Sequence, residues 1–106
     1  MRILLCGARG FIGDRVAETL QQAGHEVLRG VRAPTPGRSA ERQVDFVNWR
    51  APESWRTTLM GVDAVVNAVG VLRDRRGQPM QAIHAEVPEA LFQACARQGV
   101  RRVIHI

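Results

Sequence analysis

Gly7-Ala8-Arg9-Gly10-Phe11-Ile12-Gly13 links a short apolar run, residues 3–6, to an amphipathic stretch, residues 12–23. This order predicts a buried strand, a tight glycine turn and the start of a helix. Glycine has no Cβ, so the turn can adopt positive φ angles and its backbone N–H groups can approach an anion closely. The following helix adds unpaired N–H donors and the positive end of its dipole. The stretch therefore predicts a phosphate site between the first strand and the first helix.

The glycines are spaced as G-x-x-G-x-x-G, at Gly7, Gly10 and Gly13. The first gap is one residue longer than in the usual dinucleotide-binding pattern, G-x-G-x-x-G. The position of the turn directly after the first strand favours a dinucleotide pyrophosphate as the ligand. The alternative is an ordinary strand-to-helix turn in which the glycines only allow close packing.

Composition limits the other possibilities. The chain has 106 residues, enough for one domain (residues 1–106), and all 15 of its basic residues are arginines, with a formal net charge of +5. The arginines are scattered and no aromatic residues interleave with them, so we expect a solvated basic surface and no nucleic-acid partner. No apolar run approaches about 20 residues, so no membrane span is expected.

Cys6 and Cys95 are too few for a disulfide framework and lack metal-ligand spacing. We expect them to be small core residues, with no metal site. Because no targeting segment precedes the first strand, a cytoplasmic location is expected.

Strands and helices alternate along the chain. Strands are predicted at residues 2–6, 26–29, 43–47, 63–69 and 102–106, and helices at 12–23, 52–60 and 79–98, the last kinked or split by Pro88. The alternation implies an α/β fold, a Rossmann-type doubly wound parallel sheet with strand order 3-2-1-4-5. Because no helix follows the last, apolar strand, we expect the chain to be the truncated N-terminal portion of a longer protein.

Four segments, in this order, carry a family resemblance: GARGFIG (7–13), GHEV (24–27), GVDAVVNAVG (61–70) and ACARQGVRRVIHI (94–106). The succession resembles the extended and atypical short-chain dehydrogenase/reductases, the NAD(P)-dependent epimerase/dehydratase group. Within that group it is most similar to the NmrA-like and complex I NADPH-binding-subunit branches. The resemblance covers nearly all of the chain.

The resemblance implies cofactor-binding roles. The glycines at 7, 10 and 13 would cradle the pyrophosphate, with Phe11 and Ile12 offering backbone N–H groups. Asp45, with Phe46, occupies the place where an acidic residue usually meets the adenine; alternatively Asp45 is a turn residue. Asn67-Ala68-Val69-Gly70 matches the segment that runs beneath the cofactor, although Asn67 could equally be a structural tie between strands.

The resemblance also implies what is missing. In the family, a tyrosine and a lysine four positions later handle the proton while the cofactor carries the hydride. This chain has no tyrosine and no lysine, so no catalytic residue is assigned, and we expect catalytic residues downstream of Ile106. His84 matches a position where many relatives have an asparagine. The alternative is that His84 is a histidine of the helix surface or of the packing. The loop 72–77 follows the fourth predicted strand, and we expect it near an anionic substrate or the nicotinamide. The alternative is a basic surface loop.

Arginines near the expected adenosine end favour NADP over NAD. An acidic residue about 20 positions beyond the glycines would select NAD by accepting a hydrogen bond from the ribose 2′-OH. That place holds Val31 and Arg32, with Arg29 close by and Arg9 inside the glycine turn. A guanidinium pairs with phosphate through two charge-assisted hydrogen bonds. The alternative is that Arg29 and Arg32 are solvated strand-edge residues.

Three functions follow from these observations. The first is the NADP(H)-binding portion of an oxidoreductase or epimerase that acts on a small-molecule substrate in its full-length form. The second is a non-catalytic NADP(H)-binding redox sensor or assembly subunit. The third is an interaction domain that binds no nucleotide.

Overall fold

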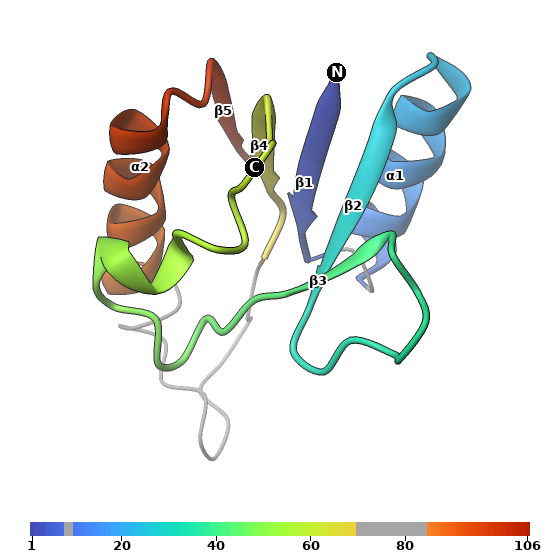
Figure 1. The fold of residues 1–106 in the computed structure, drawn as a ribbon. Helices are drawn as coiled ribbons and strands as arrows, with labels where there is room; N and C mark the ends of the chain where they lie inside the picture. Colours follow the sequence, from blue (N-terminus) through green and yellow to red (C-terminus); the bar gives the residue numbers. More distant parts are fainter. Residues whose placement is uncertain (8–9, 70–84) are drawn as a thin grey trace.

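The computed structural model describes residues 1–7, 10–69 and 85–106, and its strands form one parallel sheet. Their order is β3-β2-β1-β4-β5 (Figure 1), which confirms the predicted doubly wound arrangement. The strands are β1 (Arg2–Cys6), β2 (Glu26–Val31), β3 (Glu41–Gln43), β4 (Ala64–Asn67) and β5 (Arg102–His105). The helical elements of the described residues include α1 (Phe11–Gln22), η1 (Pro52–Trp55) and α2 (Val87–Gln98).

Alternate side chains of the strands build one hydrophobic layer on each face of the sheet. On one face, Leu4 and Val65 pack with Trp55 of η1 and Leu91 of α2. On the other face, Ile3, Leu5 and Val66 pack with Ala17 of α1. The sheet therefore lies between α1 and the pair formed by η1 and α2 (Figure 1).

The elements nearest the glycine turn follow the sequence closely. β1 has the predicted bounds, and α1 begins one residue before the predicted start. The helix ends at Gln22, with Gly24 two residues beyond at φ +91°. β2 runs two residues further than predicted, to Val31.

β4 is shorter than the predicted strand 63–69, and two other predicted elements differ more from the structure. The third strand ends at Gln43 instead of covering residues 43–47, because the Asp45 carboxylate accepts the N–H groups of Val47 and Asn48 and turns the chain. The predicted helix 52–60 is only the 3-10 turn Pro52–Trp55. Thr58 Oγ1 instead donates to the Gln43 carbonyl at 2.6 Å, which ties this segment to the end of β3.

Pro88 lies in the first turn of α2, a position that proline tolerates, and the kink or split expected there stays a prediction. The part of the predicted helix at residues 79–84 lies outside the described residues. No helix in residues 1–7, 10–69 and 85–106 is long and apolar enough to cross a membrane.

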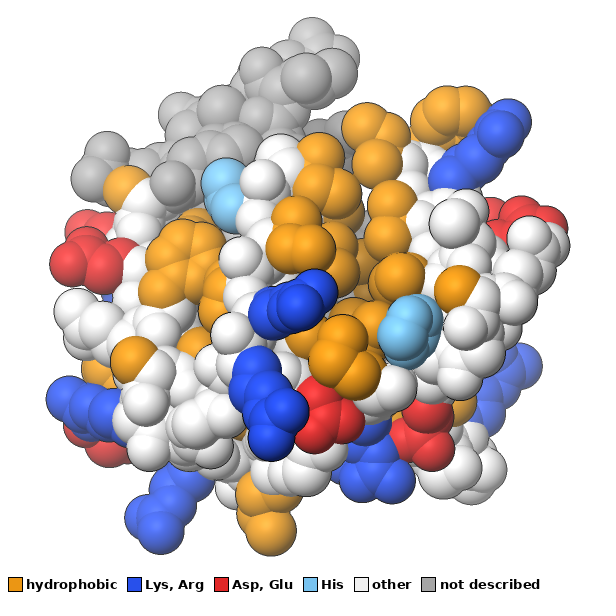
Figure 2. All heavy atoms as spheres, turned by 90° about the horizontal axis from the view of Figure 1, so that it is seen from above, with side chains coloured by type: hydrophobic (Ala, Val, Ile, Leu, Met, Phe, Trp, Pro, Cys, Tyr) orange, Lys and Arg blue, Asp and Glu red, His pale blue; other side chains and the backbone are white. Residues whose placement is uncertain are grey.

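β5 pairs with β4 and is exposed along its length. Viewed from above, hydrophobic side chains gather over the central part of the molecule (Figure 2). Exposed apolar residues at the end of the described chain include Ile104 and Ile106, at 54% and 55% exposure. This part of the sheet therefore carries an apolar surface that no described helix covers.

Candidate cofactor-binding site

The carboxyl ends of the central strands meet at one edge of the sheet. Cys6, the last residue of β1, lies beside Gly30 of β2 and Asn67 of β4. The strand order changes direction at β1. On its two sides the connections lie on opposite faces of the sheet, since α1 covers one face and η1 and α2 cover the other. In open parallel sheets, ligands bind in the crevice outside such a switch point.

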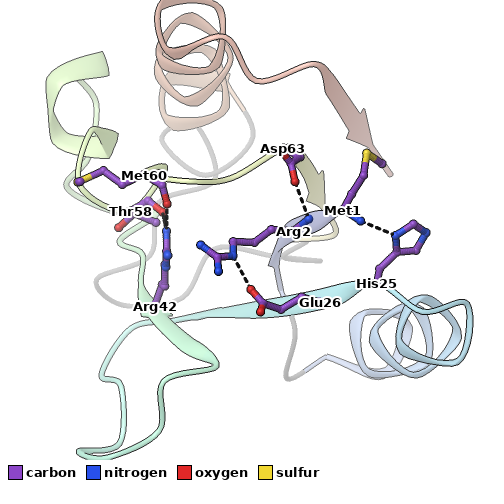
Figure 3. A network of polar contacts seen from close by, with 8 residues as sticks. All are labelled: Met1, Arg2, His25, Glu26, Arg42, Thr58, Met60 and Asp63. Carbon is purple, nitrogen blue, oxygen red and sulfur yellow. Dashed lines mark hydrogen bonds and ion pairs between the residues drawn. The ribbon is translucent and has the colours of Figure 1, made fainter.

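The opposite edge is closed by polar contacts (Figure 3). The Arg2 side chain pairs with Glu26, and the Arg2 backbone N–H donates to Asp63 at 2.8 Å. The N-terminal amine lies 3.2 Å from Nδ1 of His25. Asp63 is thus a strand-start residue, and the polar groups of this edge satisfy one another.

Gly7 follows β1 directly, in a conformation that only glycine adopts without strain, with φ +84°. A Cβ at this position would lie 2.7 Å from the carbonyl carbon and oxygen of Ala68 and 2.8 Å from the nitrogen of Val69. Ala68 is also held to β1 by a 2.9 Å hydrogen bond from its N–H to the Cys6 carbonyl. The glycine turn therefore lies directly against the backbone that leaves β4.

Gly10 is the N-cap of α1, with φ −78° and ψ 166°, and no side chain caps this helix end. Its N–H donates to the Gly7 carbonyl at 3.1 Å, and its own carbonyl accepts the N–H of Asp14 at 2.9 Å. The first intrahelical donor is the Asp14 N–H, so the N–H groups of residues 11–13 precede it and have no acceptor within the helix. An uncapped helix start with free donors suits an anion.

The residues at positions 11–13 differ in their exposure. Phe11 and Ile12 are 78% and 56% exposed, so only their backbone N–H groups belong to the helix start. Gly13 is buried and lets α1 approach the sheet. Arg9 lies outside the described residues.

Arg29 and Arg32 differ in their surroundings. The Arg29 guanidinium lies 3.3 Å from the Asp14 carboxylate on α1, so its charge has a partner on the protein. Arg32 is exposed just beyond β2, and its charge acts on Asp45.

Asp45 organises the turn after β3. Its carboxylate accepts hydrogen bonds of 2.9 Å from the N–H groups of Val47 and Asn48 and from the Asn48 side chain. Partial burial raises the pKa of Asp45, but these hydrogen bonds and the charge of Arg32 together lower it below its ordinary value. The neighbouring Phe46 packs edge-on against Trp55, with ring centroids 5.3 Å apart. Asp45 thus shapes this turn, and the Phe46 ring belongs to the core.

Asn67 is the last residue of β4 and is 1% exposed. Its Oδ1 accepts the Val69 N–H at 3.2 Å, and its Nδ2 lies 3.1 Å from Nδ1 of His105 on β5. His105 was not among the predicted site residues; its place opposite Asn67 in paired parallel strands is the signal that could have identified it. Gly70, the loop 72–77 and His84 lie outside the described residues.

The two cysteines are buried and free, which confirms that they are core residues. Burial raises the pKa of the Cys6 thiol far above its ordinary range, with a smaller contribution from Cys95, and raises the pKa of Cys95 to about 11. Within the described part of the chain, no three His, Cys, Asp or Glu side chains come together to hold a metal ion.

Comparison with known families gives a match along almost the whole chain. The model of the NAD dependent epimerase/dehydratase family matches residues 3–106. A mouse relative, NADH dehydrogenase (ubiquinone) 1 alpha subcomplex subunit 9, mitochondrial, is 28% identical over 108 residues, covering 94% of this chain and 29% of the relative. An epimerase family protein of Mycobacterium bovis is 34% identical over 105 residues, covering 83% of this chain and 33% of the relative.

A solved structure has the same fold. A short-chain dehydrogenase/reductase superfamily protein from Agrobacterium tumefaciens, with bound NAD, superposes with a TM-score of 0.78 at 23% identity. The match covers 99% of this chain and 32% of that protein. The chain thus spans about a third of the length of these three proteins.

Proposed function

The chain belongs to the NAD-dependent epimerase/dehydratase family, and from that premise we propose that it is the NADP(H)-binding portion of an oxidoreductase or epimerase. The observation that carries the proposal is the glycine turn. Gly7 brings the turn against the Ala68 backbone, and α1 then begins without a side-chain cap. The start of α1 therefore follows the carboxyl end of β1, at the edge of the sheet where such folds bind ligands.

The residues present fit a dinucleotide. The backbone N–H groups of residues 11–13 would hold the pyrophosphate, supported by the helix dipole. Asp45 and the turn that it shapes would lie at the adenine, and Arg32 at the 2′-phosphate. Residues 67–70 would line the cofactor from the end of β4.

A bound nicotinamide cofactor supplies hydride transfer. The residues of this chain bind and orient it; none of them is assigned a proton-transfer role, since the sequence holds neither tyrosine nor lysine. We therefore expect cofactor binding by these 106 residues and turnover only with residues supplied by a longer polypeptide.

The direct test is a calorimetric or fluorescence titration of the chain with NADPH and with NADH. We expect saturable binding of both and tighter binding of NADPH. Absence of saturable binding to either nucleotide, with the fold intact by circular dichroism, would eliminate the proposal and leave an interaction domain.

The preference for NADP(H) is tested at Arg32. Arg32→Ala removes a charge-assisted contact to the 2′-phosphate, a type of bond worth roughly 1.5–3 kcal/mol, so NADPH affinity falls about tenfold or more. NADH affinity stays unchanged because NADH has no 2′-phosphate. Arg56→Ala, an exposed arginine beside η1, removes the same charge away from the site and serves as the control. Equal losses for NADPH and NADH would contradict the assignment.

The likeness to the mouse mitochondrial subunit favours a second candidate function, a non-catalytic NADP(H)-binding assembly subunit or redox sensor. This function predicts the same binding but no oxidation of NADPH by the full-length protein with any carbonyl substrate. Turnover by the full-length protein would exclude this second function and favour the oxidoreductase or epimerase.

A further inference from the structure

We propose that His105 is a positioning residue for the glycine turn, acting through Asn67 and the backbone that leaves β4. The inference deepens the proposed function and rests on it, because the ligand whose affinity it affects is the dinucleotide. His105 need not touch that ligand.

The direction of the hydrogen bonds defines the role of each atom. Asn67 Oδ1 accepts the Val69 N–H, so the amide can offer only its Nδ2 to the histidine. Nδ2 is a donor, so Nδ1 of His105 must accept, and the ring proton of the neutral imidazole then lies on Nε2. His105 thereby fixes the orientation of the Asn67 amide.

Asn67 passes this constraint to the glycine turn. The Val69 nitrogen that its amide holds is one of the three backbone atoms that would lie within 2.8 Å of a Cβ at Gly7. Gly7 and the backbone after β4 therefore lie so close together that not even a Cβ fits between them, and we expect a shift of one to displace the other. The order of contacts is His105, Asn67, Val69 and Gly7.

The histidine ring is itself held on two sides. β5 places it beside Asn67, and the Ile106 N–H donates to the Asn67 carbonyl at 2.9 Å. Phe92 of α2 meets the ring edge-on, with centroids 5.9 Å apart and planes at 90°. The acceptor nitrogen is thus presented to Asn67 in a fixed direction.

An apolar residue at position 105 would leave a donor without its acceptor. Asn67 is 1% exposed, so an Nδ2 group deprived of its partner either stays unsatisfied or rotates the amide away from Val69. Either outcome loosens the backbone beside Gly7. A purely structural tie between β4 and β5 would instead lower stability without a specific effect on the pyrophosphate.

The test compares His105→Leu, which removes the acceptor, with His105→Asn, whose Oδ1 can take the place of Nδ1. His25→Leu, at the opposite edge of the sheet, is the control. The affinity of each folded variant is measured for NADP⁺ and for 2′-AMP, which has no pyrophosphate. We expect His105→Leu to weaken NADP⁺ about fivefold, the typical worth of one hydrogen bond. Its affinity for 2′-AMP should be unchanged, and His105→Asn should restore most of the loss.

Amide hydrogen exchange of the unliganded protein gives a second readout. The Val69 N–H should exchange faster in His105→Leu and recover protection in His105→Asn. Unchanged protection of Val69, or equal losses for NADP⁺ and 2′-AMP, would overturn the inference. If the wild-type chain bound no dinucleotide, the proposed function would fail, and the exchange of Val69 would still decide whether His105 positions the turn.

Discussion

Gly10→Asp separates cofactor binding from folding, because the structure accepts a side chain at this position. Among the described residues, a Cβ on Gly10 would meet the Gly7 carbonyl alone, at an ordinary 3.4 Å. The backbone already has the extended conformation of an N-cap, with φ −78° and ψ 166°. Aspartate is among the preferred N-cap residues, since its carboxylate accepts the N–H groups of the first helical turn.

The magnitudes follow from these positions. Capping and the helix dipole together should stabilise the fold by about 0.5 kcal/mol, which raises Tm by about 3 °C for a domain of this size. The same carboxylate would stand beside the pyrophosphate. For two unit charges about 5 Å apart and an effective dielectric constant of about 20, the repulsion is about 3 kcal/mol, a loss of affinity of at least about 100-fold.

The assay pairs thermal unfolding with titration of NADPH, and Gly10→Asn is the matched control. Asparagine caps the helix equally well but carries no charge. We expect Gly10→Asn to lose much less affinity than Gly10→Asp, with both variants at least as stable as the wild type. If Gly10→Asp bound NADPH within threefold of the wild type, the pyrophosphate would not lie at this helix start. A fall in Tm would refute the view that Gly10 is dispensable for folding.

Three further predictions follow from neighbouring groups. Gly7→Ala combines a strained positive φ with backbone overlap, so the free energy of unfolding in denaturant titrations should fall by about 3 kcal/mol, and an unchanged value would refute the close approach. The lowered pKa of Asp45 means that its hydrogen bonds stabilise the fold above its unfolded pKa and are lost as pH falls through its folded pKa. As the pH falls below about 4, the free energy of unfolding should therefore decrease less in Asp45→Asn than in the wild type. Parallel profiles of unfolding free energy against pH would contradict this. Because burial keeps Cys6 and Cys95 protonated, iodoacetamide at pH 8 should modify neither thiol until the protein unfolds, as mass spectrometry would detect.

The elements around the glycine turn could be predicted because their signals are local. β1 is a continuous apolar run, and α1 is bounded by glycines at both ends. The segment from β3 to η1 could not be predicted in the same way, because long-range contacts shape it. The Arg42 guanidinium donates to the carbonyls of Thr58 and Met60, and Trp55 Nε1 donates to the Trp49 carbonyl. These contacts tie the segment to β3 and to the turn before η1, and its β-branched threonines favour helix only weakly.

In the candidate site, too, residues with a local sequence pattern could be predicted and residues brought together by long-range contacts could not. The pattern G-x-x-G-x-x-G identifies three glycines but not the different reasons for them. Gly7 is required by its own backbone and by Ala68, whereas Gly13 is a buried residue of α1. The role of His105 was not predictable from spacing, because its partner Asn67 lies 38 residues earlier and only the strand register brings them together.

Gly10 then carries the strongest functional argument in the chain. Nothing in the described fold demands glycine there: φ is negative, a Cβ has room, and the helix start lacks a cap. Serine, asparagine or aspartate would serve folding better, since each would satisfy a free N–H group. Natural chains depart from such local rules mainly at functional sites. A glycine that folding does not need, at a helix start whose donors are free, supports the view that a ligand completes the cap.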